Sequence, residues 1–196
     1  MVQEPLVSVV MPVRNRERLV AEAIASLRRQ TFSRWELIVI DDASTDGTAQ
    51  AVRALAVEDR RIRLLSVSKQ SSIAAVRNHG LRIAAAPLIA GMDSDDLSHP
   101  DRLERLVREL EKRPDIAAIS SWALKIDGQG KEEGAVRTSC HSVDLHWETP
   151  LVDPLLHPAS MIRREALMAV GGYDESYALC EDSRLWVMLD QKGYRF

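Results

Sequence analysis

The first two thirds of the chain alternate continuous apolar runs with segments whose apolar residues recur every three or four positions. A short continuous run is typical of a buried strand, whereas the three-to-four repeat is typical of an amphipathic helix. The runs predict five strands, at residues 6–13, 35–40, 62–67, 88–92 and 116–121. The repeats predict four helices between them, over 16–29, through Val52 and Leu55, over 72–86 and over 100–113.

This alternation predicts an α/β fold in which a mostly parallel central sheet is flanked by helices. Ligands of such sheets bind beyond the carboxyl ends of the strands. The residues that directly follow the predicted strands are therefore the first candidates for a site. They are Arg14-Asn15, Asp41-Asp42 and the run 93–96.

The rhythm changes after residue 122. Gly128-Gln129-Gly130 predicts a turn between two short strands, and repeated prolines predict a loop over 138–158. A helix over 164–170, a turn at 171–173 and a helix over 182–191 follow, and the chain reaches residue 196 within an expected strand. We expect one domain over 1–196, with a first part over about 1–121 and a second part over about 122–196 that is cut short at the C-terminus.

Composition is that of an ordinary globular protein, with 45% hydrophobic and 28% charged residues. The net charge is −3 and the 26 basic residues are spread along the chain, so no nucleic-acid partner is expected. No apolar stretch approaches the roughly 20 residues that cross a bilayer, and the start lacks the pattern of a signal peptide. We expect a cytoplasmic protein without a transmembrane segment, with peripheral contact to the inner membrane face left open.

Three carboxylates lie within four residues at the end of the fourth predicted strand, in Asp93-Ser94-Asp95-Asp96. Crowding of this kind is repulsive unless a cation compensates it. Few, hard oxygen ligands suit Mg²⁺ or Mn²⁺ when a diphosphate supplies the remaining oxygens. The alternative is a polar turn that caps the helix beginning near Pro100.

Three further groups combine acidic or basic side chains with predicted element ends. Asp41-Asp42 can accept hydrogen bonds from a nucleobase or ribose, or can form a turn and helix cap. Arg77 can pair with a nucleotide or orient a carboxylate, or can lie on a helix surface. Glu181-Asp182 opens a helix, where a carboxylate serves either as a general base or as a partner of the helix dipole.

Together these segments resemble the inverting glycosyltransferases of family 2, which have the glycosyltransferase-A fold. The matching motifs occur in the family's order over residues 6–196. They are the runs 7–15 (VSVVMPVRN), 36–48 (ELIVIDDASTDGT), 75–80 (AVRNHG), 93–96 (DSDD), 171–175 (GGYDE) and 181–182 (ED).

The resemblance implies a donor site for a nucleotide sugar in the first part of the chain. Asp42 resembles the aspartate that contacts the base of the donor, with Pro12 and Val13 forming the backbone around it. Arg77 resembles the arginine that reaches the nucleotide. Asn15, at the end of the first strand, is included in the expected donor site.

The resemblance also implies a metal ligand and a catalytic base. Asp93 resembles the first acid of the DxD motif, near the ribose and the metal, and Asp95 resembles the ligand of Mn²⁺ or Mg²⁺. Asp182 resembles the base, with Glu181 beside it, and the choice between these two carboxylates stays open. His157-Pro158 and Gly171-Gly172 would shape the acceptor side in residues 122–196.

The family's reaction is a single displacement, in which the base deprotonates an acceptor hydroxyl that attacks the anomeric carbon with inversion. The resemblance therefore implies a hexosyltransferase with a UDP-sugar as the expected donor, although GDP- and dTDP-sugars stay open. The expected acceptor is a glycan or a lipid-linked molecule, in the synthesis of a cell-surface or extracellular polysaccharide. The chain lacks the Gln-x-x-Arg-Trp motif, which disfavours a processive synthase.

Two alternatives belong to other functional classes. A haloacid-dehalogenase-like phosphatase would use Asp93 as nucleophile and Asp95 as acid, but Asp96-Leu97 stands where that class has Gly-Thr or a similar pair. The second alternative is a nucleotide-sugar-binding module that is inactive as this chain.

Overall fold

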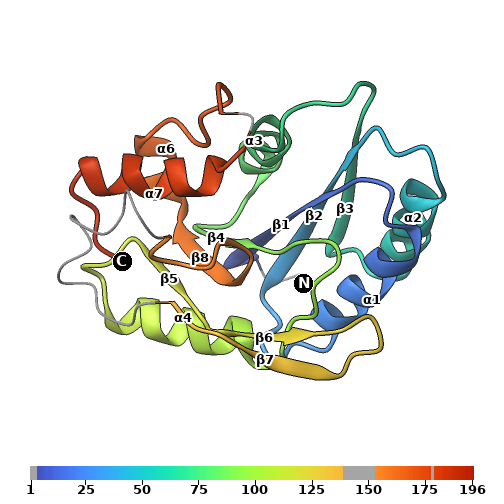
Figure 1. The fold of residues 1–196 in the computed structure, drawn as a ribbon, viewed down its shortest axis with the longest axis horizontal. Helices are drawn as coiled ribbons and strands as arrows, with labels where there is room; N and C mark the ends of the chain where they lie inside the picture. The colour runs from blue at the N-terminus through green and yellow to red at the C-terminus, as the bar shows by residue number, and fades with distance from the viewer. Residues whose placement is uncertain (1–3, 139–152, 178) are drawn as a thin grey trace.

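A six-stranded sheet forms the centre of the molecule (Figure 1). The computed structural model describes residues 4–138, 153–177 and 179–196. The strand order is β3-β2-β1-β4-β8-β5, and within this sheet β8 runs antiparallel to both of its neighbours, β4 and β5, while the other pairs are parallel. The strands are β1 (Val7–Val13), β2 (Trp35–Asp42), β3 (Ile62–Val67), β4 (Leu88–Gly91), β5 (Ala118–Ser120) and β8 (Ser160–Arg163).

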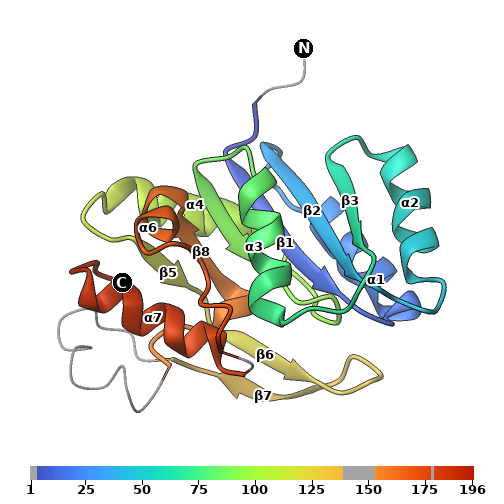
Figure 2. The same ribbon diagram turned by 90° about the horizontal axis from the view of Figure 1, so that it is seen from above.

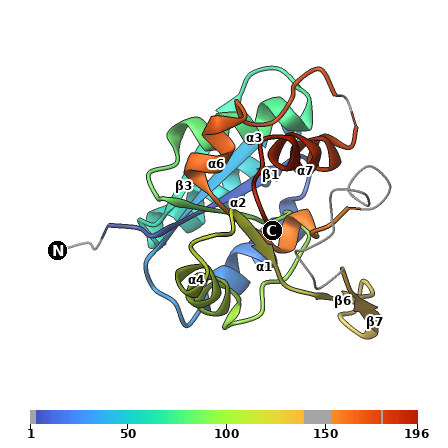
Figure 3. The ribbon, with the colours of Figure 1, turned by 90° about the vertical axis from the view of Figure 1, so that its left-hand side faces the viewer.

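Alternate residues of a strand point to opposite sides of the sheet. Because apolar side chains project from both faces here, helices cover both of them. Val9 and Met11 of β1 face one core, where α1 (Glu17–Arg28), α2 (Thr48–Glu58) and α4 (Arg102–Lys112) pack. Val10 of β1 faces the other core, shared with α3 (Ile73–Ile83), α6 (Arg164–Ala169) and α7 (Glu181–Gln191). Figure 3 shows α6 and α7 on one side of the sheet and α4 on the other.

A separate hairpin of β6 (Ala123–Ile126) and β7 (Glu132–Val136) lies beside the main sheet (Figure 2). Its turn contains the predicted Gly128-Gln129-Gly130 segment, so the two short strands expected there are confirmed. Nearly all residues of the hairpin strands are exposed. The predicted loop over 138–158 lies mostly outside the described residues, and its described end includes the short helix η1 (His157–Ala159).

The alternation of strands and helices is confirmed, with two differences near the C-terminus. No strand was predicted at β8, because its four residues contain only Met161 and Ile162 as apolar positions, too few to show a period. The strand expected at the chain end is wrong, since Arg195 forms only an isolated bridge with Ile116. No helix within the described ranges is long and apolar enough to cross a membrane.

Candidate active site

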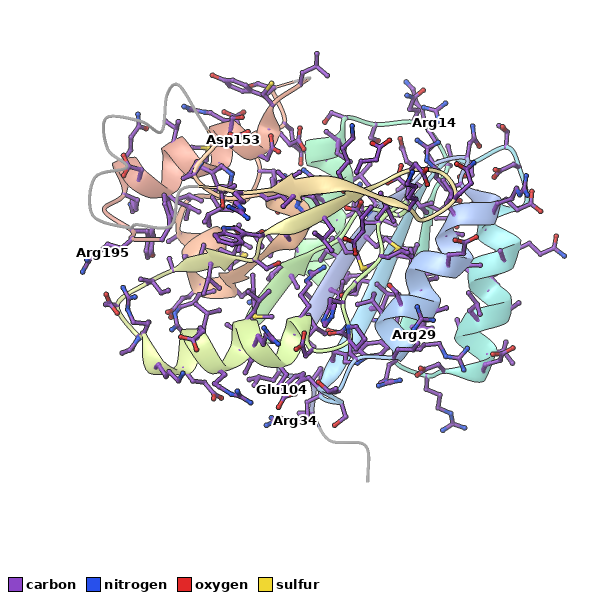
Figure 4. The ribbon with its side chains drawn as sticks, turned by 60° about the horizontal axis from the view of Figure 1, so that its bottom comes forward. Arg14, Arg29, Arg34, Glu104, Asp153 and Arg195 are labelled. Carbon is purple, nitrogen blue, oxygen red and sulfur yellow. The ribbon has the colours of Figure 1, made fainter. Side chains whose placement is uncertain are left out.

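The candidate residues lie at the carboxyl edge of the sheet. Figure 4 labels Arg14, just beyond β1, at one end of the strands and Arg34, just before β2, at the other. The residues predicted at the strand ends lie in the last positions of β1 and β2 or directly after β1 and β4, so they share the end marked by Arg14. Parallel strands therefore assemble, at one edge, side chains that are far apart in sequence.

The loop after β4 concentrates negative charge. Burial raises the pKa of Asp93, although the nearby Arg77 guanidinium opposes the rise. Burial, followed by repulsion from Asp93 and Asp95, raises the pKa of Asp96 to about 6. The Asp95 carboxylate is partly exposed, and its Oδ2 lies 3.4 Å from Nε of Arg16. A cation near these groups would favour their charged forms.

The chemistry of this loop suits a divalent cation, because Mn²⁺ and Mg²⁺ prefer carboxylate oxygens. Among the residues that the structure describes, no three His, Cys, Asp or Glu side chains are grouped as a complete metal site. Asp93 and Asp95 would therefore hold such an ion only with help from ligand oxygens. A diphosphate offers oxygens of this kind.

Arg77 connects this loop to the start of α7. Its side chain is buried, and its guanidinium forms an ion pair with Glu181 and lies 3.4 Å from Oδ1 of Asp93. The guanidinium also lies 5.8 Å from the ring centroid of Tyr173. The alternative of a surface arginine is therefore wrong. The structure brings Arg77, Asp93 and Glu181 into one cluster, although they come from three separate elements.

Asp182 follows Glu181 on the same helix but has different surroundings. Glu181 is buried against Arg77, whereas Asp182 is only partly buried. Asp182 contributes to the raised pKa of Asp93, so the two carboxylates are close enough to repel each other. Cys180 adopts a left-handed conformation with φ of 59°, which turns the chain sharply into α7. The contacts of Arg77 with Glu181 and Asp93 hold the start of α7 beside the loop after β4.

The loops after β1, β2 and β3 are joined around Asp42. Oδ1 of Asn15 accepts a hydrogen bond from the backbone N–H of Thr45 at 2.8 Å. Oδ1 of the buried Asp42 accepts one from the N–H of Ser71 at 2.9 Å. Pro12 and Val13 pair with the end of β2 in the parallel ladder. Four predicted donor residues thus lie together at the carboxyl ends of β1 and β2.

A buried pair of neutral side chains supports the Arg77 cluster. Nε2 of His157 and the hydroxyl of Tyr173 are 2.8 Å apart. Burial lowers the pKa of His157 well below its usual value, and Arg77 lowers it further. Burial raises the pKa of Tyr173 to about 12. Both groups are therefore uncharged near pH 7 and add no charge to the cluster.

A groove of about 630 Å³ opens beside Asp96, between α4 and the β6–β7 hairpin. Its wall is mainly apolar and includes the side chains of Leu97, Trp122 and Leu124, and at least half of the surface of each of these residues is exposed. Arg102 lines the groove and donates a hydrogen bond from Nη2 to the carbonyl oxygen of Gly91 at 2.6 Å. Because Asp96 belongs both to the acidic loop and to the lining of the groove, the groove is continuous with that loop.

No individual role was predicted from the sequence for three residues around the site. Arg16 faces Asp95, Asn78 contacts the turn at 171–175, and Tyr173 contacts His157. Arg16 directly follows the candidate Asn15, and Asn78 directly follows the candidate Arg77. Adjacency to a predicted site residue could therefore have indicated both of them. Nothing in the sequence indicates the partner of Tyr173, because that contact depends on tertiary packing.

Comparison with known proteins gives a consistent assignment. The family model described as Glycosyl transferase family 2 matches residues 8–171. The Bacillus subtilis protein EpsE, named as a glycosyltransferase, is 34% identical over 194 residues, covering 97% of this chain and 69% of that protein. The Escherichia coli protein WcaA, named as a colanic acid biosynthesis glycosyl transferase, is 39% identical over 103 residues, covering 53% of this chain and 37% of that protein.

Two solved structures share the fold. The mannosyltransferase PcManGT from Pyrobaculum calidifontis, in complex with GDP-Man and Mn²⁺, has a TM-score of 0.76 at 23% identity, covering 98% of this chain and 54% of that chain. TarS from S. aureus, in complex with UDP-GlcNAc, has a TM-score of 0.71 at 21% identity, covering 93% of this chain and 52% of that chain. The chain thus spans about half the length of these structures.

These matches confirm the predicted family, fold class and transferase class. They exclude the phosphatase alternative, because the family match covers most of the chain. The roles of individual residues stay predictions.

Proposed function

The chain belongs to glycosyl transferase family 2, and from this premise we propose that it transfers a sugar, with inversion, from a nucleotide-diphosphate sugar to an acceptor hydroxyl. One observation supports this proposal above the others. A single buried guanidinium, that of Arg77, contacts Asp93 of the acidic loop and Glu181 next to Asp182. This contact supports a donor site and a base that lie next to each other, because it connects the acidic loop with the start of α7.

The proposed donor site uses the loops joined around Asp42. A carboxylate in this position can accept hydrogen bonds from a nucleobase, with Pro12, Val13 and Asn15 shaping the surrounding backbone. A UDP-sugar is the donor we propose. Of the two structural neighbours, one holds UDP-GlcNAc and the other GDP-Man, so both nucleotides belong in the experiment.

Asp95 and Asp93 are the proposed ligands of a divalent cation, Mn²⁺ or Mg²⁺. The ion would supply positive charge to the departing diphosphate, where negative charge increases in the transition state. PcManGT was solved with Mn²⁺. In this chain the charges of Asp93 and Asp95 add to the rise in the pKa of Asp96, so a cation would relieve repulsion within this loop. Arg77, close to Asp93, adds a fixed positive charge at the same place.

Asp182 is the proposed general base, rather than Glu181. A base must be able to take a proton from the acceptor hydroxyl. The Glu181 carboxylate is buried and already occupied by its ion pair with Arg77, which blocks its approach to a substrate. Asp182 is more exposed and lies near Asp93. We therefore assign Glu181 the role of positioning the first turn of α7.

The proposed acceptor is a glycan or a lipid-linked molecule in the synthesis of a bacterial surface polysaccharide. The name of WcaA supports this setting. A cytoplasmic location, with peripheral contact to the inner membrane face, fits an enzyme that uses nucleotide sugars and such acceptors.

The test is nucleotide release from UDP-glucose, UDP-N-acetylglucosamine and GDP-mannose with Mn²⁺, with and without a bacterial lipid extract as acceptor source. Asp182→Asn should lower the rate at least about 100-fold, because it removes the base, while UDP affinity stays unchanged. Glu111→Gln changes an exposed carboxylate on α4 and serves as the matched control.

Full turnover by Asp182→Asn would exclude Asp182 as the base. The inactive binding module would instead be favoured if the wild-type protein binds the nucleotides but cleaves none of the nucleotide-sugar donors with any acceptor source.

A further inference from the structure

Asn78 of α3 uses its whole side-chain amide on one distant turn. Its Nδ2 donates to the carbonyl oxygen of Tyr173 and to Oε1 of Glu175, both at 2.8 Å. Its Oδ1 accepts from the N–H of Tyr173 at 2.9 Å. Asn78 is buried, so these groups have no water to replace the contacts if they are lost. The side chain pairs with Tyr173 as a neighbouring strand would.

The turn is shaped to receive this amide. Gly172 has φ of 82°, a conformation that favours glycine. A Cβ atom at Gly172 would also lie 2.6 Å from Oδ1 of Asn78. Position 172 therefore requires glycine for two reasons: its backbone has a positive φ, and the Asn78 side chain lies too close to leave room for a Cβ atom.

The turn continues to α7 through aromatic contacts. The Tyr173 hydroxyl meets Nε2 of His157, and the His157 ring lies 6.0 Å from the ring of Trp186 on α7. Arg77, the residue before Asn78, contacts Glu181 in the first turn of α7. Two adjacent residues of α3 thus hold both the start of α7 and the turn that supports it, and Figure 1 shows α3 beside α7.

We propose that Asn78 is a positioning residue for the transfer reaction, fixing the turn at 171–175 so that α7 holds Asp182 against the acidic loop. The proposal rests on the function proposed above. Asn78 itself touches no reacting atom in this scheme. It acts through Tyr173 and His157, and Arg77 acts directly on Glu181. Displacement of a catalytic group by about 1 Å can lower a rate roughly 100-fold, so a lost hydrogen-bonded turn is expected to matter.

The test variant is Asn78→Asp, which keeps the shape of the side chain but removes both N–H donors. It also places a carboxylate against the carbonyl oxygen of Tyr173 and against Glu175. We expect the kcat of nucleotide release to fall by about 10- to 100-fold. The KM for the donor and the affinity for UDP with Mn²⁺ should change less than about twofold, because the donor loops are untouched. Hydrogen exchange of the α7 peptide 181–191 should become faster.

Gln30→Glu is the matched control. Gln30 is another buried amide that joins two segments, since its Nε2 donates to the carbonyl oxygen of His99 and its Oε1 accepts from the N–H of Leu103. This control should lower the unfolding midpoint to a similar degree while kcat and exchange in α7 stay near wild-type values.

An equal fall of kcat in both variants at equal loss of stability would overturn the positioning role. Unchanged exchange in α7 of Asn78→Asp would overturn it as well, even if no donor is turned over. Failure of the proposed function would be recognised separately, as absence of nucleotide release by the wild-type protein.

Discussion

At residue scale, the centre of the candidate site is one guanidinium that lies between two carboxylates. Arg77 presents separate nitrogens to Glu181 and Asp93, a geometry that a planar fork provides and a lysine ammonium does not. Both Arg77 and Glu181 are buried, so each needs the other to compensate the loss of water. The sequence indicated Arg77 and Glu181 separately, but it contained no sign that they pair.

The pairing predicts a pronounced interaction between mutations. Arg77→Met should destabilise the protein by about 3–5 kcal/mol, because it leaves the Glu181 carboxylate buried without a partner. Arg77→Met combined with Glu181→Leu should be more stable than Arg77→Met alone. Urea unfolding of the two single variants and the double variant measures the coupling. Additive effects would show that the two charges are independently solvated.

His157 predicts a pH dependence of stability. Its pKa in the folded protein is lowered, so below about pH 6.5 the unfolded chain binds a proton that the folded chain does not. The free energy of unfolding should therefore fall as the pH decreases from 6.5, by up to roughly 1.4 kcal/mol per pH unit from this group. His157→Gln should reduce that slope. Urea unfolding at several pH values between 5 and 8 compares the wild-type protein with His157→Gln. If the free energy of unfolding depends on pH equally in both, His157 is not the group responsible.

At element scale, long or strongly periodic segments were predictable, whereas the short strand β8 was not. Strand β2 and helix α4 each show a clear pattern, with every residue of β2 buried and one apolar face on α4. Strand β8 does not, because its identity comes from pairing with β4 and β5 rather than from its own composition. Pairing of this kind is a tertiary property that a single sequence does not display.

Gly91 tests how closely β4 approaches η1. A Cβ atom at this position would lie 2.6 Å from the backbone carbonyl oxygen of His157, which cannot rotate away as a side chain can. Gly91→Ala should therefore destabilise the protein by about 1–3 kcal/mol through overpacking. Gly128→Ala is the control, since its Cβ would meet no atom within 4 Å, and its effect should stay within about 0.5 kcal/mol. Thermal unfolding of both variants tests this prediction. Equal unfolding midpoints for Gly91→Ala and Gly128→Ala would contradict the close contact between β4 and η1.

At the scale of the whole molecule, the fold could be predicted because the alternation of strands and helices fixes a parallel sheet and its carboxyl edge. The carboxyl edge then indicated Asp42 and Asp93. The remaining parts of the site depend on segments beyond residue 153 that return to this edge, such as Tyr173 and His157. Their position follows from tertiary contacts with α3 and α7 rather than from local pattern.

Ligand binding should stabilise the whole molecule by mass action. UDP with Mn²⁺ at one hundred times the dissociation constant should add about 2.7 kcal/mol to the free energy of unfolding. Asp95→Ala should remove the part of this stabilisation that depends on Mn²⁺, because it removes a proposed metal ligand. Thermal shift with UDP, with and without Mn²⁺, provides the measurement. An unchanged Mn²⁺ effect in Asp95→Ala would exclude Asp95 as a ligand.

The insertion of β8 between β4 and β5 also sets the order in which the sheet can be completed. During synthesis both neighbours leave the ribosome before the strand that joins them. Until β8 arrives, one edge of β4 has no partner, and unpaired strand edges promote association between chains. Contacts between such distant segments also slow folding. A nascent chain stalled before residue 160 is therefore expected to depend on chaperones, whereas one released after β8 can close its sheet.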